Sequence, residues 1–395
     1  MPSMTVVYAR EEAPEELVSS IFLIGPTPTQ NGVHSWRTDA LRLLADAGFE
    51  GVVFVPESRP DEFGNTRFRA DYTDQIEWER CYLHMADVLL AWVARSEQNP
   101  GITTNFELGE FIDSGKLVYG APADAWKTRY ARYWARKLQV PDAVTLGETV
   151  TLALQLIGEG ASRTGGEREV PLFIWRTPHF QQWYQALRTA GNRLDGARVV
   201  WTWRLGAGRK IVFFWILHAM VWIAAEGRHK ANEVVLARPD ISAIVLYQRA
   251  ETLDDCRVVL VKEFRTPVHN ADGYVWENPG GSSWSETAAP LTIAAQECHE
   301  ETGLEVEPSR FVRHESRQLV SNLSAHRAHL FSVELTEEEM AWVMSQAGVA
   351  YGVVEDTERT YISVARLGDI RAESLVDWSH LGMILQVLAP GDRKE

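Results

Sequence analysis

Three glutamates, Glu297, Glu300 and Glu301, end a predicted helix that begins at Pro290 and stops at Gly303. Their i, i+3, i+4 spacing makes them neighbours on the helix surface. Like charges repel, and anions at a helix C-terminus oppose the macrodipole, each effect costing about 0.3–1 kcal/mol. A divalent cation such as Mg²⁺ would relieve this repulsion, because hard cations take carboxylate ligands and bridge to phosphates. A solvated acidic helix end is the other interpretation of these charges.

A further carboxylate with potential chemistry is Glu107. The run Thr104-Asn105-Phe106-Glu107 opens another predicted helix and matches a capping box, in which the glutamate reaches back to the backbone. The second interpretation places Glu107 beside a ligand crevice, where the helix dipole keeps its carboxylate ionised. Such a carboxylate can attack an anomeric carbon, as in retaining glycosyl transfer. The local residues leave both interpretations open.

Alternating apolar strands and helices must position Glu107. The strands are predicted at residues 20–25, 51–55, 87–93 and 116–120, and the helices at 35–48, 74–86 and 103–115. This alternation predicts a doubly wound parallel sheet, flavodoxin-like or Rossmann-like, with helices on both faces. Ligands of such sheets bind beyond the strand C-termini. Gly25, Pro26, Pro56, Glu57 and the loop before Glu107 are therefore expected around one crevice.

The pattern changes after two more predicted helices, at residues 123–137 and 145–159. The Gly-rich polar run 158–169 is predicted as a linker. Long strands follow between residues 197 and 264, which indicates a mixed or antiparallel sheet. The most apolar run, Ile211 to Ala225, is too short to span a bilayer and is predicted as a buried strand.

Composition restricts the partners and the compartment. The 395 residues carry a net charge of −15, with 45% hydrophobic and 24% charged residues, as in globular proteins long enough for two or three domains. The negative charge argues against broad binding of nucleic acid or membranes. Three well-separated cysteines and the lack of a visible signal peptide favour a cytoplasmic location.

Segment 280–304 resembles the Nudix hydrolase signature. Gly280 and Glu286 begin the pattern, and the three glutamates of the helix end complete it. The resemblance implies that these three glutamates hold Mg²⁺ or Mn²⁺. Two departures stand out, because the spacing after Glu286 is two residues longer than usual and Gln296 stands in place of the family arginine. Cys298 at an aliphatic position is a mild substitution.

Segments 258–267 and 274–281 are similar to the ADP-ribose and nucleoside-diphosphate-sugar pyrophosphatase branch of that family. The resemblance implies an α+β Nudix domain preceded by a β-rich extension. It also implies metal-assisted attack of water on a nucleoside diphosphate linked to another group. Residues 195–235 would form the extension and the contact of a homodimer or higher homo-oligomer.

The same resemblance implies roles for single residues. The Gly280–Gly281 backbone would approach the phosphates, Arg265 would contact phosphate or base, and Glu277 would contact ribose or metal. A glutamate on a late loop would act as base, and Glu358 is preferred to Glu355 because a strand follows it. The alternatives are a surface salt bridge, a turn cap and a charged surface loop, respectively.

Residues 18–160 resemble the nucleoside 2-deoxyribosyltransferase family, which includes nucleoside and nucleotide N-glycosidases. The resemblance rests on IFLIGP at 21–26, MADVLLAWV at 85–93 and FELGEFIDSGKLVY at 106–119. It implies that Glu107 is the nucleophile, and that Asp87 contacts the base or positions the nucleophile. A local turn bond is the alternative role for Asp87.

One position departs from that family, since Gly101 stands where a second aspartate is common. Base recognition would then fall to other residues of the crevice. These candidates are Asn99, Asn105, Asp74 and Trp78. Gly25 is expected to contact the substrate. Ser35, Trp36 and Arg37 are candidates for a 5′-phosphate at a helix start, although a helix cap with an exposed arginine is the simpler interpretation.

Together the motifs predict a bifunctional enzyme of nucleotide metabolism. A deoxyribosyltransferase-like domain is expected at 15–162, a linker and β-rich extension at 163–235, and a Nudix domain at 236–395. The first domain would cleave or exchange an N-glycosidic bond, and the last would hydrolyse a phosphoanhydride. The substrate would be a small nucleotide or nucleotide sugar. A nucleotide-binding sensor with one or both sites inactive is the alternative, which Gly101 and Gln296 support.

Overall fold

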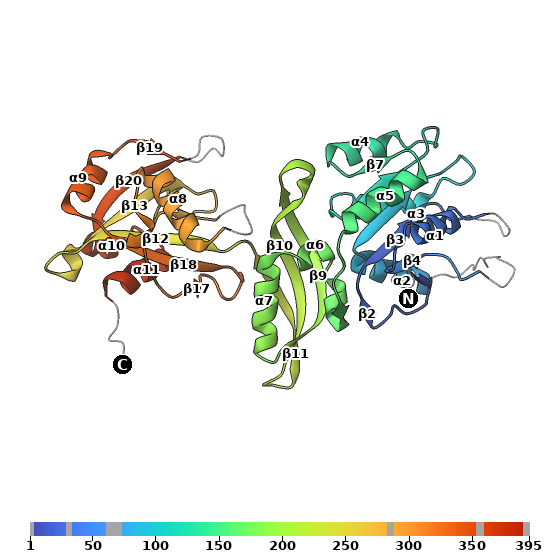
Figure 1. Cartoon of the computed structure of the whole chain (residues 1–395), viewed down its shortest axis with the longest axis horizontal. Helices are drawn as coiled ribbons and strands as arrows, with labels where there is room; N and C mark the ends of the chain where they lie inside the picture. The colour runs from blue at the N-terminus through green and yellow to red at the C-terminus, as the bar shows by residue number, and fades with distance from the viewer. Residues whose placement is uncertain (1–3, 29–33, 61–72, 283–287, 353–358, 390–395) are drawn as a thin grey trace. The chain divides into compact units, whose positions relative to one another are not determined.

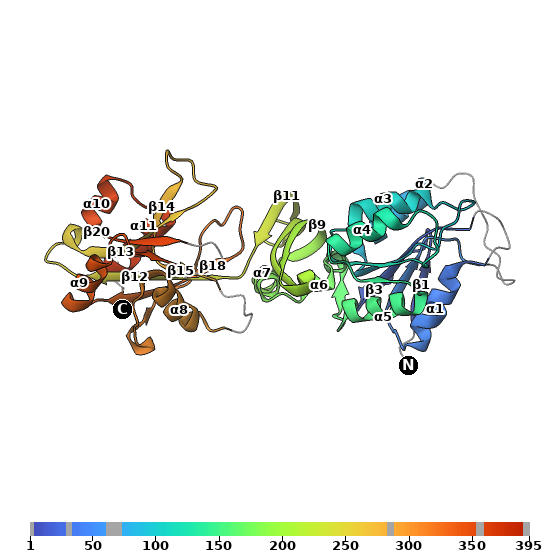
Figure 2. The same ribbon diagram turned by 90° about the horizontal axis from the view of Figure 1, so that it is seen from above.

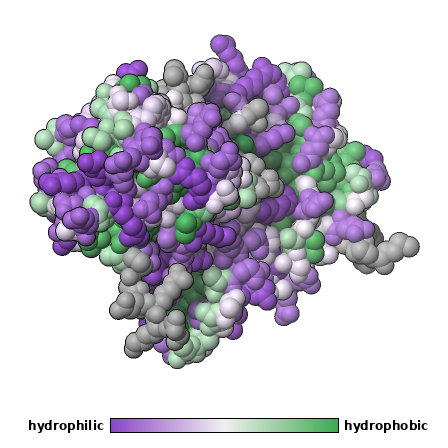
Figure 3. All heavy atoms as spheres, turned by 60° about the vertical axis from the view of Figure 1, so that its left-hand side comes forward, coloured by the Kyte–Doolittle hydropathy of each residue, from purple (hydrophilic) through white to green (hydrophobic). Residues whose placement is uncertain are grey.

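The computed structural model describes residues 4–28, 34–60, 73–282, 288–352 and 359–389. The chain divides into two compact units, Met1–Ala237 and Arg238–Glu395. Among the described residues, no helix is both long and apolar enough to cross a membrane. The face seen in Figure 3 is mostly hydrophilic, with hydrophobic side chains gathered in small groups between polar ones.

A parallel sheet forms the base of the first unit (Figure 1). Its strands are β1 (Thr5–Tyr8), β3 (Ser20–Ile24), β4 (Val52–Val55), β5 (Val88–Trp92), β6 (Leu117–Gly120) and β7 (Asp142–Ala143). Their order is β1-β4-β3-β5-β6-β7, and every neighbouring pair is parallel. The four strands predicted from the sequence are confirmed, and β1 and β7 extend the sheet. The order reverses between β3 and β5, the place where doubly wound sheets bind ligands.

Helices cover both faces of this sheet (Figure 2). One face carries α2 (Thr73–Met85), α3 (Ile102–Phe111) and α4 (Arg129–Lys137), and the other carries α1 (Trp36–Asp46) and α5 (Leu146–Ile157). Strands β3 to β6 are completely buried because apolar side chains point into both layers. The predicted helices are confirmed as elements, but the one expected at 123–137 begins only at Arg129.

Helix α3 starts earlier than its sequence predicts. Gly101 is the N-cap residue, in the left-handed conformation with φ 58°. Thr104 is therefore already inside the helix, and the capping box predicted for Thr104 and Glu107 does not form. Glu107 lies beyond the first turn, so the helix dipole acts on it less strongly than expected.

The Gly-rich run 158–169 is packed against the first sheet, and its prediction as a linker is wrong. Within it, β8 (Arg163–Thr164) pairs with β2 (Glu16–Leu17), and a 3₁₀ turn follows at Gly165–Glu169. Arg163 is completely buried and forms an ion pair with Asp87. A buried ion pair holds this segment in place, which glycine content alone cannot reveal.

A three-stranded antiparallel sheet completes the first unit. It consists of β9 (Arg193–Leu205), β10 (Ile211–Ile223) and β11 (Arg228–Ala237), in the order β11-β10-β9. Helices α6 (Leu172–Trp175) and α7 (Pro178–Thr189) precede it. The buried Trp215 of β10 packs against Phe180 and Trp183 of α7. The strand predicted from the apolar run at 211–225 is thus confirmed.

The second unit is built on a nine-stranded mixed sheet. Its strands are β12 (Ile241–Gln248), β13 (Arg257–Phe264), β14 (Tyr274–Glu277), β15 (Gly280–Gly281), β16 (Val312–Arg313), β17 (Arg317–Gln318), β18 (Arg327–Glu334), β19 (Ala350–Tyr351) and β20 (Thr360–Arg366). Helices α8 (Pro290–Thr302) and α9 (Glu337–Ser345) cover one face, and α10 (Leu367–Ala372) and α11 (Trp378–Leu388) cover the other. The predicted helix from Pro290 is confirmed, and Gly303 ends it with φ 69°.

Candidate functional site

A buried arginine lies at the reversal point of the sheet, where the crevice is expected. Ser35 caps α1 by accepting a hydrogen bond from the Arg37 amide, as its type predicts. Arg37 itself is only 2% exposed, so the expected exposed arginine is wrong. Its Nη1 lies 2.6 Å from Oε1 of Glu57, and its Nη2 donates to the Gly25 carbonyl over 2.7 Å. This guanidinium therefore ties the ends of β3 and β4 together.

Gly25 allows the ends of β3 and β5 to approach each other. A Cβ atom at this position would lie 2.3 Å from the Trp92 carbonyl oxygen and 2.8 Å from the Trp36 ring. Its φ of 154° also disfavours other residues. Glycine is thus required here by packing, and its predicted contact with substrate stays a prediction.

Two carboxylates, Glu79 of α2 and Glu107 of α3, interact in this crevice. Burial and, secondly, the negative charge of Glu79 raise the pKa of Glu107, the positive charge of Arg37 lowers it, and the net result is a pKa of about 7. Burial also raises the pKa of Glu79, partly offset by a hydrogen bond from Gln75 and by the charges of Arg37 and Arg10. Two carboxyl groups that repel each other tend to share one proton.

Gln75 fixes the position of Glu79. Its Nε2 donates to Oε1 of Glu79 over 2.8 Å and to the Pro56 carbonyl, at the end of β4, over 3.0 Å. Its Oε1 accepts from Arg10 over 3.0 Å. The amide therefore holds Glu79 against the C-terminal edge of the sheet. Sequence reasoning missed Glu79 and Gln75, although their i, i+4 spacing on a helix that follows a parallel strand was a usable signal.

Residues 18–125 match the family described as nucleoside 2-deoxyribosyltransferase like. The match includes the strands around the reversal point together with Arg37, Glu79 and Glu107. This part of the chain is therefore similar to a family named for the transfer of nucleoside 2-deoxyribosyl groups. All matched residues lie in the first unit. None of the curated proteins matches the chain.

Asp87 of the deoxyribosyltransferase-like domain has a structural role, which corrects its prediction as a catalytic residue. It precedes β5, at the opposite edge of the sheet from the crevice. Its carboxylate accepts from Nη1 and Nη2 of Arg163 over 2.8 and 2.7 Å, from Ser20 Oγ over 2.9 Å, and from the Leu172 amide over 2.9 Å. With four donors satisfied in a buried position, it has no group left for a ligand.

Lys116, in the segment FELGEFIDSGKLVY, is also structural. Its buried Nζ donates to the carbonyls of Leu83, His84 and Ala86 over 2.6, 2.7 and 3.0 Å. These carbonyls lie at the C-terminal end of α2, where backbone acceptors lack helical partners. The lysine thus fixes the helix that carries Glu79.

The candidates for base recognition do not all reach the crevice. Trp78 is a core residue, because its ring packs between Phe22 and Phe54 and its Nε1 donates to the Glu11 carbonyl over 2.7 Å. This core position argues against Trp78 as the candidate for base recognition that the sequence suggested. Asp74 is exposed at the start of α2, 3.0 Å from Arg10, and its role in base recognition stays a prediction.

Asn99 lies near Arg37, because both side chains donate to Thr27, whereas Asn105 lies on another side of α3. Asn99 donates to the Thr27 carbonyl over 3.1 Å. Asn105 accepts from Arg95 over 2.7 Å. Asn105 and Glu107 are two positions apart on α3, about 200° around the helix axis, so they face opposite sides. Asn105 therefore does not join Glu107 in one site, contrary to its prediction.

The second unit gathers carboxylates around the turn between β14 and α8. Glu301 is buried and accepts from the Gly280 amide over 2.8 Å. Burial raises the pKa of Glu301 well above its ordinary value, and the charges of Glu297 and Glu263 raise it further. A Cβ atom on Gly281 would lie 2.3 Å from Oε1 of Glu297, so this carboxylate approaches the Gly281 backbone closely.

Glu300 is oriented differently from its two neighbours. Its Oε1 accepts a hydrogen bond from Gln296 over 2.9 Å. Within the described residues, no three His, Cys, Asp or Glu side chains come together in a group that could hold a metal ion. The convergence predicted for Glu297, Glu300 and Glu301 is therefore limited to an interaction between Glu297 and Glu301.

Arg265 is held between acidic side chains. Its Nη2 lies 2.8 Å from Glu263 and 2.7 Å from Glu277, whose Oε2 also accepts from Nε over 3.1 Å. The salt bridge weighed as the alternative for Arg265 is thus present, and the phosphate and ribose contacts of Arg265 and Glu277 stay predictions. Glu358, the predicted base, lies outside the described residues.

Proposed function

We propose that the deoxyribosyltransferase-like domain cleaves or transfers the N-glycosidic bond of a nucleoside or nucleotide through Glu107. The observation that carries this proposal is the pair of interacting carboxylates, Glu107 and Glu79, at the reversal point of the sheet. Such an environment supports one ionised and one protonated carboxyl group at neutral pH.

The reaction follows from these two states. The Glu107 carboxylate attacks the anomeric carbon, a C–O bond forms, and the C–N bond to the base breaks with its electron pair. The leaving base takes a proton, and Glu79 is the adjacent group able to hold one. Water or a second base then attacks the anomeric carbon, which releases Glu107 as the carboxylate.

A panel of nucleosides and nucleotides tests the proposal. Free base should form with the native chain and fall by about 10³-fold or more in Glu107→Ala, which loses the nucleophile. Glu110→Ala, one turn along the same helix, is the matched control and should retain activity. A substrate analogue with a slow second step should add covalently to the peptide that contains Glu107. Base release that persists in Glu107→Ala would remove the proposal.

We propose a second activity for the unit Arg238–Glu395, the Mg²⁺- or Mn²⁺-dependent hydrolysis of a nucleoside diphosphate linked to another group. Glu301, buried beside Glu297, favours it. Two adjacent carboxylates fit a cation such as Mg²⁺, whose other ligands are usually water and phosphate oxygens. When bound, the cation would polarise the diphosphate and activate water. Gly280, Gly281 and Arg265 would position the phosphates, and Glu358 is retained as the proposed base.

ADP-ribose and nucleotide sugars, incubated with Mg²⁺, test this second activity. Nucleoside monophosphate should form and should disappear in Glu301→Gln. If it forms, the first domain should be tested for removing the base of that product, since the two activities could then act in series. Binding of nucleotides without turnover at either site would instead support the sensor function.

A further inference from the structure

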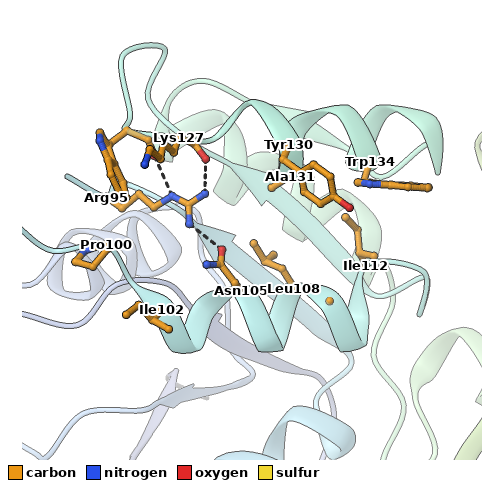
Figure 4. Close-up of a pocket in the computed structure, with 12 residues that line it drawn as sticks. Arg95, Pro100, Ile102, Asn105, Leu108, Ile112, Lys127, Tyr130, Ala131 and Trp134 are labelled. Atoms are coloured by element: carbon orange, nitrogen blue, oxygen red, sulfur yellow. Dashed lines mark hydrogen bonds between the residues drawn. The ribbon is translucent and has the colours of Figure 1, made fainter. Parts of the chain in front are cut away.

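A groove separates α3 from α4 on the side of α3 that faces away from Glu107. Its volume is about 830 Å³, within the range of small-molecule sites. Figure 4 shows the side chains of both helices that point into it. The apolar lining from the two helices includes Ile102, Leu108, Ile112, Tyr130, Ala131 and Trp134. Gly109 leaves α3 open at the middle of this lining, since a Cβ there would meet nothing within 4 Å.

The groove contains one polar group in a fixed orientation. Arg95 is buried and donates to the carbonyls of Trp126 and Lys127 over 3.0 and 2.6 Å, and to Oδ1 of Asn105 over 2.7 Å (Figure 4). Arginine has only donors, so the Asn105 side chain must accept with its oxygen. The NH₂ group of Asn105 can therefore donate to a hydrogen-bond acceptor of a ligand in the groove.

The ammonium of Lys127 lines the groove beside Arg95, whereas Arg129, Arg132, Arg136 and Lys137 line a separate hollow on another side of α4. Residues 127–137, KTRYARYWARK, contain five cations and no carboxylate in a chain of net charge −15. Lys127 lies 4.3 Å from the ring centroid of Trp126, and Lys137 lies 4.8 Å from that of Trp134. Tyr130 is 76% exposed at the groove. The aromatic rings, the Asn105 donor and the Lys127 ammonium together match a ligand with a planar ring, an acceptor edge and an anionic group.

We propose that this groove is a second ligand site that binds a free nucleotide, with the base against Tyr130 and Trp134 and the phosphate at Lys127. The base would accept a hydrogen bond from Asn105. The bounded volume favours a single nucleotide over a nucleic-acid strand. This site is separate from Glu107, because Asn105 and Glu107 face opposite sides of α3. A nucleotide bound there would contact the helix that carries the nucleophile.

Cross-linking with 8-azido-ATP on the full chain tests this site. The label should attach within residues 126–134, and excess ATP should prevent it. Asn105→Asp keeps an acceptor for Arg95 but removes the donor, so ATP binding measured by calorimetry should weaken about tenfold or more. Tyr130→Ala, at an exposed position, should weaken it similarly. Arg188→Ala, on α7 outside the groove, is the charge control and should bind normally.

The outcomes separate this proposal from the proposed catalytic function. Glu107→Gln should leave labelling of residues 126–134 unchanged, whether or not Glu107 proves to be the nucleophile. Labelling confined to other peptides, unchanged affinity in both groove variants, or binding of oligonucleotides without mononucleotides would each overturn the proposal.

Discussion

In helix α8 the amide nitrogen of Gln296 donates to Oε1 of Glu300 over 2.9 Å. The Nudix signature that this helix resembles has arginine at that position. Glutamine keeps a hydrogen bond to the carboxylate but adds no positive charge to the three glutamates. Relief of their repulsion therefore depends on Arg265, on protonation of buried Glu301, or on a bound cation.

Mn²⁺ binding tests whether a bound cation reduces the repulsion between these glutamates. Mn²⁺ titration followed by electron paramagnetic resonance should show a site whose affinity falls about tenfold or more in Glu297→Gln and in Glu301→Gln, since each loses one charged ligand. Glu337→Gln, in the first turn of α9, should bind as the native chain does. Equal affinity in all four proteins would exclude these two carboxylates as ligands.

Removal of Arg163 should destabilise the first unit. Arg163→Met leaves the Asp87 carboxylate buried without its cation, at an expected cost of about 3–5 kcal/mol. Denaturant unfolding, followed by the fluorescence of the first unit, measures this loss. Arg42→Met removes an exposed arginine between Asp39 and Asp46 and should change stability by less than about 1 kcal/mol.

The same measurement tests the correction for Asp87. Asp87→Asn should lower stability in parallel with any loss of activity. If Asp87→Asn kept native stability and lost only turnover, the catalytic role predicted from the sequence would be restored.

The rate of base release should depend on the ionisation of Glu107. As nucleophile it must be a carboxylate, so kcat/KM should rise with pH and reach half its maximum at about pH 7. In Glu79→Gln the midpoint should move to lower pH, because the negative charge that raises the pKa of Glu107 is removed. Glu77→Gln, on the exposed side of α2, should not move it.

Folding stability should carry the opposite pH dependence. The pKa of Glu107 is raised from 4.5 to about 7 in the folded chain, so the folded state holds the proton more tightly than the unfolded state. Its contribution is present below about pH 4.5 and is lost as the pH rises to about 7, by at most about 3 kcal/mol. Denaturation midpoints should therefore fall less with pH in Glu107→Gln than in the native chain. Parallel curves for the two proteins would contradict the raised pKa.

The sequence predicted a helix or strand well where neighbouring residues alone determine it. Pro290 and Gly303 mark the ends of α8 because one residue fits the first helical turn and the other fits a left-handed cap. Continuous apolar runs predicted β3 to β6 because both faces of a parallel sheet are covered.

The site residues were harder to predict because their environment is made by distant segments. The exposure expected for Arg37 was wrong because Glu57, a strand away, neutralises it in the interior. The role of Asp87 depends on Arg163, 76 positions along the chain. Glu79 interacts with Glu107 only because the fold brings α2 and α3 together. The periodicity of a sequence does not predict which distant residues will pair in the folded chain.

The Asp87–Arg163 pair also bears on where the first unit can be shortened. The family match ends at residue 125, yet the cation that neutralises Asp87 comes 38 residues later, since 163 − 125 = 38. A chain cut at 125, or even at 162, would keep the whole matched segment and leave a carboxylate buried without its counter-ion. The segment recognised by similarity is therefore smaller than the segment able to fold, and expression trials should retain Arg163 and the Leu172 amide.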